Sequence, residues 1–224
     1  MIFVIRPEPG LHATLAAARD MGLAVVGMPL FEVIPLAWQM PQDDQFDAIL
    51  AGSSNVFRHG GEKLSQLAHL PVRAVGGATA AAAREAGFAV EAAGEGGLQA
   101  LLDSDIAPRN YLRLAGAEHV MLQLPPGSTM TTRHVYEVRA LPITGSAEVS
   151  LRAGDPLVLL HSAAAARHFA SEVDRLGMDR AALRLACIGS RVAQAAGPGW
   201  AEVSHAPQPS DASLLALARD MCHE

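Results

Sequence analysis

Short polar side chains follow an apolar run at two places in the chain. Ser53, Ser54 and Asn55 come directly after one such run, and Ser162 comes after a second. Side chains of this kind cap the first turn of a helix, and the free backbone N–H groups of that turn attract anions. Neither Ser53 nor Ser162 stands in a G-x-S-x-G turn, so a hydrolase nucleophile is not indicated. The pattern favours hydrogen-bond donors for a carboxylate or phosphate.

Two glycine-containing turns follow other apolar runs. Gly76 and Thr79 belong to a Gly-Gly-Ala-Thr segment, and Gly189 and Ser190 form the corresponding turn later in the chain. These turns are too short and generic to indicate a dinucleotide site. They predict tight packing of a strand against a helix, with N–H groups available to an anion.

Three larger side chains could act beside these turns. Arg6 ends the first apolar run, where it could bind a ligand carboxylate or form a structural salt bridge, and both interpretations stay open. Arg113 lies within the corresponding run of the second half, and we favour a structural role for it. Tyr136 matches Phe31, so it is either a core aromatic residue or a hydroxyl donor and weak acid at a cleft edge.

The sequence lacks the signatures of several function classes. It contains no G-x-G-x-x-G or P-loop motif, no C-x-x-C and no H-E-x-x-H, so neither a cofactor nor a metal is expected. A net charge of −6 and a pI near 5.8 give no general attraction to nucleic acid or anionic membranes. No signal peptide or membrane span is visible, and the two cysteines are far apart, so we expect a reducing cytoplasm.

Apolar runs of strand length alternate with Ala- and Leu-rich helical segments across short Gly and Ser turns. This alternation predicts an α/β fold of parallel βαβ units, in which the carboxyl ends of the strands meet at one edge. A short helix is also expected from about Glu118 to Pro125. The expected strands cover residues 2–5, 24–28, 31–36, 48–51, 72–75, 88–91, 111–114, 135–138, 157–160 and 185–188.

The second half of the chain repeats the first. Ser53 falls on Ser162, and the segment 30–33 matches 135–138. We therefore predict a tandem duplication of a flavodoxin-like, doubly wound unit. Two similar lobes make a cleft between them the default ligand site.

A set of short motifs occurs in a specific order along nearly the whole chain. The motifs are Val4-Ile5-Arg6-Pro7, a proline at position 29, the Leu50–Val56 strand and turn, Ala74-Val75-Gly76-Gly77-Ala78-Thr79-Ala80, Gly97-Leu98, Val135-Tyr136-Glu137 and Ile188-Gly189. Together they resemble the uroporphyrinogen-III synthase family, although Val192 stands where many members carry a threonine.

The resemblance implies a particular architecture. Members have two flavodoxin-like domains joined by a two-stranded β linker, and one domain is built from both chain ends. Carried over, residues 1–35 and 142–224 form one domain and residues 36–141 form the other. The segments 31–36 and 135–141 would be the linker strands.

The resemblance also implies a reaction. The substrate would be hydroxymethylbilane, a linear tetrapyrrole with eight carboxylates, which is cyclised with loss of water and inversion of ring D. No cofactor is required, the protein is possibly a monomer, and catalysis rests on positioning the substrate. Tyr136 would be the general acid or would position the substrate. The substrate carboxylates would be held by Arg6, Ser53, Ser54, Asn55, Gly76, Thr79, Ser162, Gly189 and Ser190.

Two alternatives stay open at this point. The chain could be a non-enzymatic intracellular two-lobed binding or sensor protein for a small polyanion. It could also be a catalytically inactive member of the family, an interpretation that Val192 favours.

Overall fold

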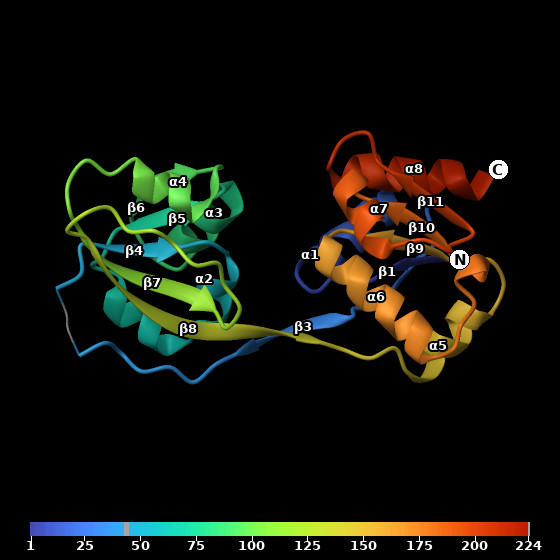
Figure 1. Ribbon diagram of the computed structural model, residues 1–224, viewed down its shortest axis with the longest axis horizontal. Helices are drawn as coiled ribbons and strands as arrows, with labels where there is room; N and C mark the ends of the chain where they lie inside the picture. The colour runs from blue at the N-terminus through green and yellow to red at the C-terminus, as the bar shows by residue number, and fades with distance from the viewer. Residues whose placement is uncertain (43–44, 224) are drawn as a thin grey trace. The chain divides into compact units, whose positions relative to one another are not determined.

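The computed structural model describes residues 1–42 and 45–223. The chain divides into two compact units (Figure 1). Unit 1 contains Met1–Glu32 and Ala140–Glu224, and unit 2 contains Val33–Arg139. The chain passes between the units at strand β3 (Phe31–Pro35) and at the end of strand β8 (Thr129–Ala140).

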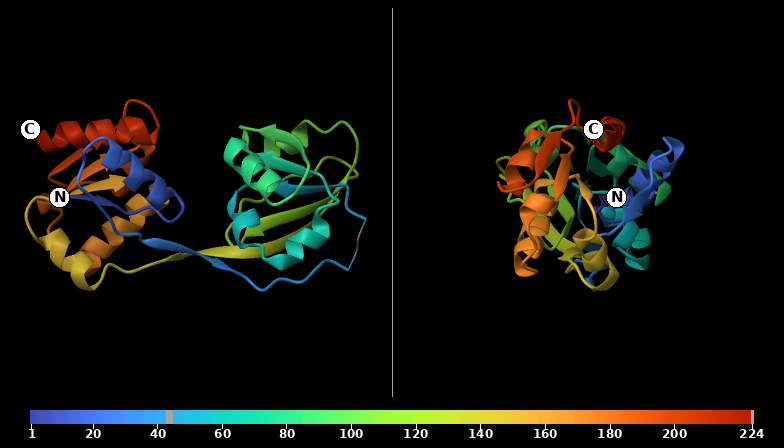
Figure 2. Two further views of the ribbon diagram at one scale, coloured as in Figure 1. Left: turned by 180° about the vertical axis from the view of Figure 1, so that it is seen from behind. Right: turned by 90° about the vertical axis from the view of Figure 1, so that its right-hand side faces the viewer.

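Unit 1 is built around a five-stranded parallel sheet with the order β11-β10-β9-β1-β2. Renumbered along this unit alone, the order reads 5-4-3-1-2, which is that of flavodoxin-like folds. Both chain termini belong to this unit, as Figure 2 shows. Its strands are β1 (Ile2–Val4), β2 (Val25–Gly27), β9 (Leu157–Leu160), β10 (Arg184–Cys187) and β11 (Glu202–His205).

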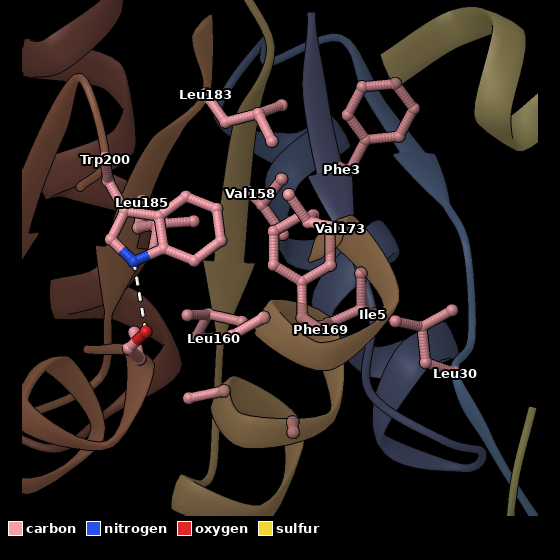
Figure 3. Packing of buried hydrophobic residues seen from close by; sticks show 14 of the residues in the cluster. Phe3, Ile5, Leu30, Val158, Leu160, Phe169, Val173, Leu183, Leu185 and Trp200 are labelled. Atoms are coloured by element: carbon pink, nitrogen blue, oxygen red, sulfur yellow. Dashed lines mark hydrogen bonds between the residues drawn. The ribbon is translucent and has the colours of Figure 1, made fainter. Parts of the chain in front are cut away.

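Helices cover both faces of this sheet. Successive side chains of a strand point to opposite faces, so Phe3 and Ile5 pack with α5, α6 and α7, whereas Ile2 and Val4 pack with α1 and α8. On the first face, the rings of Phe169 and Trp200 stack 5.7 Å apart (Figure 3). The helices are α1 (Gly10–Asp20), α5 (Gly145–Arg152), α6 (Ala163–Arg175), α7 (Ser190–Ala196) and α8 (Asp211–His223), with a 3-10 turn η2 (Arg180–Ala182).

Unit 2 contains a six-stranded sheet with the order β3-β8-β7-β4-β5-β6. Strands β4 to β8 are parallel. Leu36 donates its N–H to the Val135 carbonyl and Leu141 donates to Leu30, so β3 runs antiparallel to β8. The strands not yet given are β4 (Ala48–Ala51), β5 (Val72–Val75), β6 (Val90–Gly94) and β7 (Asn110–Gly116).

The helices of unit 2 also lie on both faces of its sheet. Leu50 and Tyr111 pack with α4, while Ile49 and Leu112 pack with α2, α3 and the 3-10 helix η1. These helices are α2 (Asn55–His59), η1 (Glu62–Leu67), α3 (Gly77–Glu85) and α4 (Gly97–Asp103).

The two sheets share one spatial order when the sequence repeat is followed. The repeat pairs β1 with β7, β2 with β8, β9 with β4 and β10 with β5, and each pair occupies the same place in its sheet. The unit 1 sheet therefore joins two strands of the first half-chain to three of the second, and the unit 2 sheet joins two strands of the second half to three of the first, with β3 added at its edge. The predicted α/β class with parallel sheets is confirmed.

The helix predicted from about Glu118 is wrong. Residues 117–125 form no helix. The amide side chain of Gln99 on α4 instead accepts from the N–H of Gln123 and donates to its carbonyl, both at 2.9 Å. A side chain thus satisfies backbone groups that helix bonds would otherwise use, and the two prolines at 125 and 126 end the apolar pattern.

Candidate functional site

A cavity of about 280 Å³ opens at the carboxyl ends of β4 and β7 in unit 2. Parallel α/β sheets bind ligands at this edge. Leu98 on α4 and the segment after β7 close its sides, and Tyr136 from β8 also contributes. The cavity is lined by Gly52, Ser53, Val56, Val75, Gly97, Leu98, Arg113, Leu114, Ala115, Gly116, Glu118, His119, Val120 and Tyr136.

Arg113 is the buried charge of this cavity. It is 2% exposed, and its Nε has no hydrogen-bond partner. Within the described part of the chain, no carboxylate forms an ion pair with its guanidinium. Burial lowers the pKa of Arg113 from its usual value, because a low-dielectric site disfavours the charged form. An unpaired buried charge lowers the stability of the free protein, so an anion bound beside Arg113 would be stabilising.

Arg73 is a buried arginine of the same sheet that forms ion pairs, although its Nε, like that of Arg113, has no hydrogen-bond partner. Leu50 of β4 stands between Arg113 and Arg73 in the strand register. Arg73 Nη2 lies 2.8 Å from Asp105 Oδ1 and donates to the Leu101 carbonyl at 3.0 Å, while Nη1 lies 3.3 Å from Glu91. Arg73 is therefore neutralised within the unit. Arg113, aligned with it across β4, forms no ion pair with a described residue.

Tyr111 forms a hydrogen bond with Asp105, the carboxylate that pairs with Arg73. Its hydroxyl donates to Asp105, and burial together with this carboxylate raises the pKa of Tyr111 to about 12. The Tyr111 proton is thus committed to Asp105, and Tyr111 is not an acid at neutral pH.

Tyr136 lies against the backbone at the cavity wall. A Cβ added to Gly116 would lie 2.9 Å from its ring, so the glycine permits this close approach. Among described residues, the Tyr136 hydroxyl has no hydrogen-bond partner. Next to it, the rings of His119 and His134 lie 4.8 Å apart, and His119 Nδ1 is 3.2 Å from the Gly116 carbonyl.

The serines after β4 have mixed placements. Ser53 lines the cavity, and its Oγ accepts from the N–H of Asn55 at 3.2 Å, which leaves its own proton available. The Ser54 hydroxyl accepts from Arg58 at 2.6 Å. Gly76, the residue before α3, takes a φ of 76°, and Thr79 on α3 is 5% exposed and so packs in the interior.

The carboxyl edge of unit 1 holds an internal ion pair. Arg6 Nη1 lies 2.9 Å from Asp211 at the start of α8 and 3.1 Å from Thr14 on α1. Thr14 also donates to Asp211 at 2.7 Å. Of the two interpretations left open for Arg6, the structure shows the salt bridge.

His161, directly after β9, packs onto this ion pair. Its side chain is 6% exposed, and Nε2 lies 3.4 Å from Asp211. Burial, aided by the charge of Arg6, lowers the pKa of His161 to about 4. The imidazole is therefore neutral at physiological pH.

The remaining predicted residues belong to unit 1. Ser162 caps α6, where its Oγ accepts from the N–H of Ala165 at 3.1 Å. Gly189 and Ser190 line a cavity of about 480 Å³ together with residues after β11. Val192, on α7, is buried in the core, so an apolar residue suits that position.

Sequence reasoning undervalued Arg113. The available signal was a charged residue inside an otherwise apolar strand, with no acidic residue at a spacing that would pair with it locally. Only the strand register shows that Arg73 uses the nearby carboxylates and that Arg113 has none.

Two classes of site find no support in residues 1–42 and 45–223. No group of three or more His, Cys, Asp or Glu side chains there could hold a metal ion. None of the helices in those ranges has the length and apolar character needed to cross a bilayer.

Comparison with known proteins identifies a relationship over most of the chain. Residues 13–216 match the family described as Uroporphyrinogen-III synthase HemD. The fold is similar to a uroporphyrinogen-III synthetase from Helicobacter pylori 26695, with a TM-score of 0.68, 18% identity and 98% of each chain covered. It is also similar to a mutant uroporphyrinogen III synthase from Thermus thermophilus, with a TM-score of 0.56, 18% identity and full coverage of both chains (100% each). A search of curated proteins finds no match.

Proposed function

Because the chain belongs to the uroporphyrinogen-III synthase family, we propose that it converts hydroxymethylbilane to uroporphyrinogen III, as a cyclising lyase of tetrapyrrole biosynthesis. The family match over residues 13–216 carries this proposal. The unit 2 cavity supports it, since a buried arginine without an internal partner suits a polycarboxylate substrate.

The reaction releases one water per substrate. The terminal hydroxyl takes up a proton and leaves as water, pushed by the pyrrole nitrogen, and the nucleophilic substituted carbon of ring D attacks the resulting azafulvene cation. The spiro intermediate then fragments and recloses with ring D inverted, and a ring proton is lost. Much of this chemistry is the substrate's own, so the protein contributes by holding the folded geometry that favours spiro attack.

Tyr136 is our candidate for the side chain nearest this chemistry. Tyr136 lines the unit 2 cavity, and its hydroxyl has no hydrogen-bond partner in the described part of the chain. It can therefore donate a hydrogen bond to the departing hydroxyl or to a substrate carboxylate.

The strand-end turns of both units are our candidates for binding the substrate carboxylates. Ser53, with an available hydroxyl proton, suits this role without rearrangement. Arg6 suits it after its ion pair with Asp211 opens. The other positions in this proposal are Ser54, Asn55, Gly76, Thr79, Ser162, Gly189 and Ser190.

We also propose that residues 1–35 with 142–224 and residues 36–141 fold as the two domains. The division into two compact units supports this. A cytoplasmic, monomeric protein is part of the same proposal, and the two free cysteines agree with a reducing compartment.

The test is to supply hydroxymethylbilane and separate the type III and type I products by chromatography. We expect type III product at a rate far above spontaneous cyclisation. Type I product alone, formed at the rate of a protein-free control, would contradict the proposed activity. It would favour a binding protein or an inactive family member.

A further inference from the structure

The burial of Arg113 is unexplained by the contacts of the protein itself. The residue is 2% exposed, its Nε lacks a hydrogen-bond partner, and no carboxylate of the described residues forms an ion pair with it. Arg73, two strands away, shows that this sheet can neutralise an arginine where it needs one. A charge left unpaired at a cavity wall is the expected state of a binding site whose anion arrives with the ligand.

The walls of the cavity are suited to a short aliphatic stem. Val56, Val75, Leu98 and Leu114 supply apolar surface around Arg113. The volume of about 280 Å³ falls just below the range of roughly 300–1,000 Å³ for sites that enclose a whole drug-sized ligand. The cavity can therefore take one arm of a large ligand and not the whole of it.

The charges around the cavity favour a single negative charge. Arg113 contributes one positive charge, and Glu118 also lines the cavity without forming an ion pair with it. A doubly charged phosphate would meet repulsion from Glu118, whereas a carboxylate has one charge and a geometry that the guanidinium fork binds with two hydrogen bonds. Ser53 can donate a further hydrogen bond.

We propose that the Arg113 cavity of unit 2 is a carboxylate subsite, which binds one acetate- or propionate-type arm of the substrate. The assignment of the arm to a tetrapyrrole rests on the proposed function. The carboxylate subsite itself rests on the burial of Arg113, its lack of an ion pair among the described residues and the lining of the cavity. Arg113 is thus a positioning residue for the substrate, and the equivalent position in unit 1 is Val4, which cannot serve in this way.

The first experiment measures anion binding without any reaction. The melting temperature of the wild-type protein is followed during titration with propionate against chloride at equal ionic strength. We expect propionate to raise Tm in the wild type and in Arg84→Met, which removes an exposed arginine of the same unit. In Arg113→Met the rise should disappear, and in Arg113→Lys it should persist in part.

The same variants give a stability test. Without anion, Arg113→Met should melt above the wild type by at least about 3 °C, because an unpaired buried charge has been replaced by an apolar side chain of similar length. An Arg113→Met protein that is less stable or does not fold would show that the arginine has an internal structural role, and the subsite would be wrong.

The second experiment uses hydroxymethylbilane. Arg113→Met should raise KM at least about tenfold, as expected for the loss of a charged hydrogen-bonded pair, with a smaller change in kcat, while Arg84→Met leaves both unchanged. An unchanged KM with unchanged propionate binding would overturn the subsite. An inactive wild type that still binds propionate through Arg113 would overturn only the proposed reaction.

Discussion

Each sheet has an arginine at or near its carboxyl edge, and the two arginines differ in whether the protein neutralises them. In unit 1, Arg6 is neutralised by Asp211, and His161 fills the space above them. In unit 2, the repeat places Gly52 where unit 1 has His161, and the space stays open as the cavity of Arg113. Unit 1 neutralises its strand-end arginine with its own carboxylate, although a cavity opens farther along the same edge at Gly189 and Ser190, whereas unit 2 leaves the charge of Arg113 without an ion pair.

The row of residues beneath each edge shows where the difference arises. Across unit 1 the register aligns Val4, Leu159 and Ala186, all of which are apolar. The matching row of unit 2 contains two arginines on either side of Leu50. Unit 1 thus has an apolar layer where unit 2 has buried charge, and buried charge in a cleft commonly marks a functional site.

The largest effect is expected when an arginine is placed in the apolar row of unit 1. We expect Val4→Arg to lower Tm by more than about 8 °C or to prevent folding, because Val4 on β1 is fully buried and packs in the apolar cluster that includes α1 and α8. Thermal denaturation followed by circular dichroism measures this. Val4→Leu, a modest change in volume, is the control, and a stable Val4→Arg protein would mean that the two rows do not differ as described.

The stability of unit 1 should depend on pH because His161 is buried in its neutral form. Its pKa is about 4 in the folded protein and about 6.5 when unfolded, so between these values the unfolded chain binds more protons. Stability from this group is complete above about pH 6.5 and falls as the pH is lowered to about 4, by about 3 kcal/mol in all.

Urea denaturation at pH 7.5, 6, 5 and 4 tests this effect. Replacement of His161 by Gln should reduce the loss of stability over that interval, whereas replacement of the exposed His12 by Gln should leave it unchanged. The same slope in all three proteins would show that His161 is not the group responsible.

The smallest effect is expected at Tyr136, which matches Phe31 in the other half of the repeat. Tyr136→Phe gives unit 2 the residue type of the first half while keeping the ring that packs on Gly116. We expect the rate of type III product formation to fall several-fold, about 1 kcal/mol of barrier, with unchanged Tm. Complete loss in a folded variant would indicate a direct chemical role, and no change would remove Tyr136 from the site.

The sequence predicted much of the architecture because its signals are local or repeated. Alternating apolar runs and turns identified the parallel α/β class, and the repeat of Ser53 at Ser162 identified the duplication. The helix expected near Glu118 failed because a side chain from α4 holds that segment in a non-helical form. Such a contact between separate elements leaves no periodic trace in the sequence.

The sequence by itself located ten of the strands, though not β11, and it indicated where the strand-end turns lie and that the two halves correspond. Hydrophobic period and turn chemistry act within a few residues, so they can be read along the chain. Only the tertiary structure decided which charges are satisfied. Arg6 meets Asp211 from the far end of the chain, Arg73 meets Asp105 across the sheet, and Arg113 meets no acid within the described residues. Those outcomes depend on register and burial, which set the energy of a charge and which no single stretch of sequence contains.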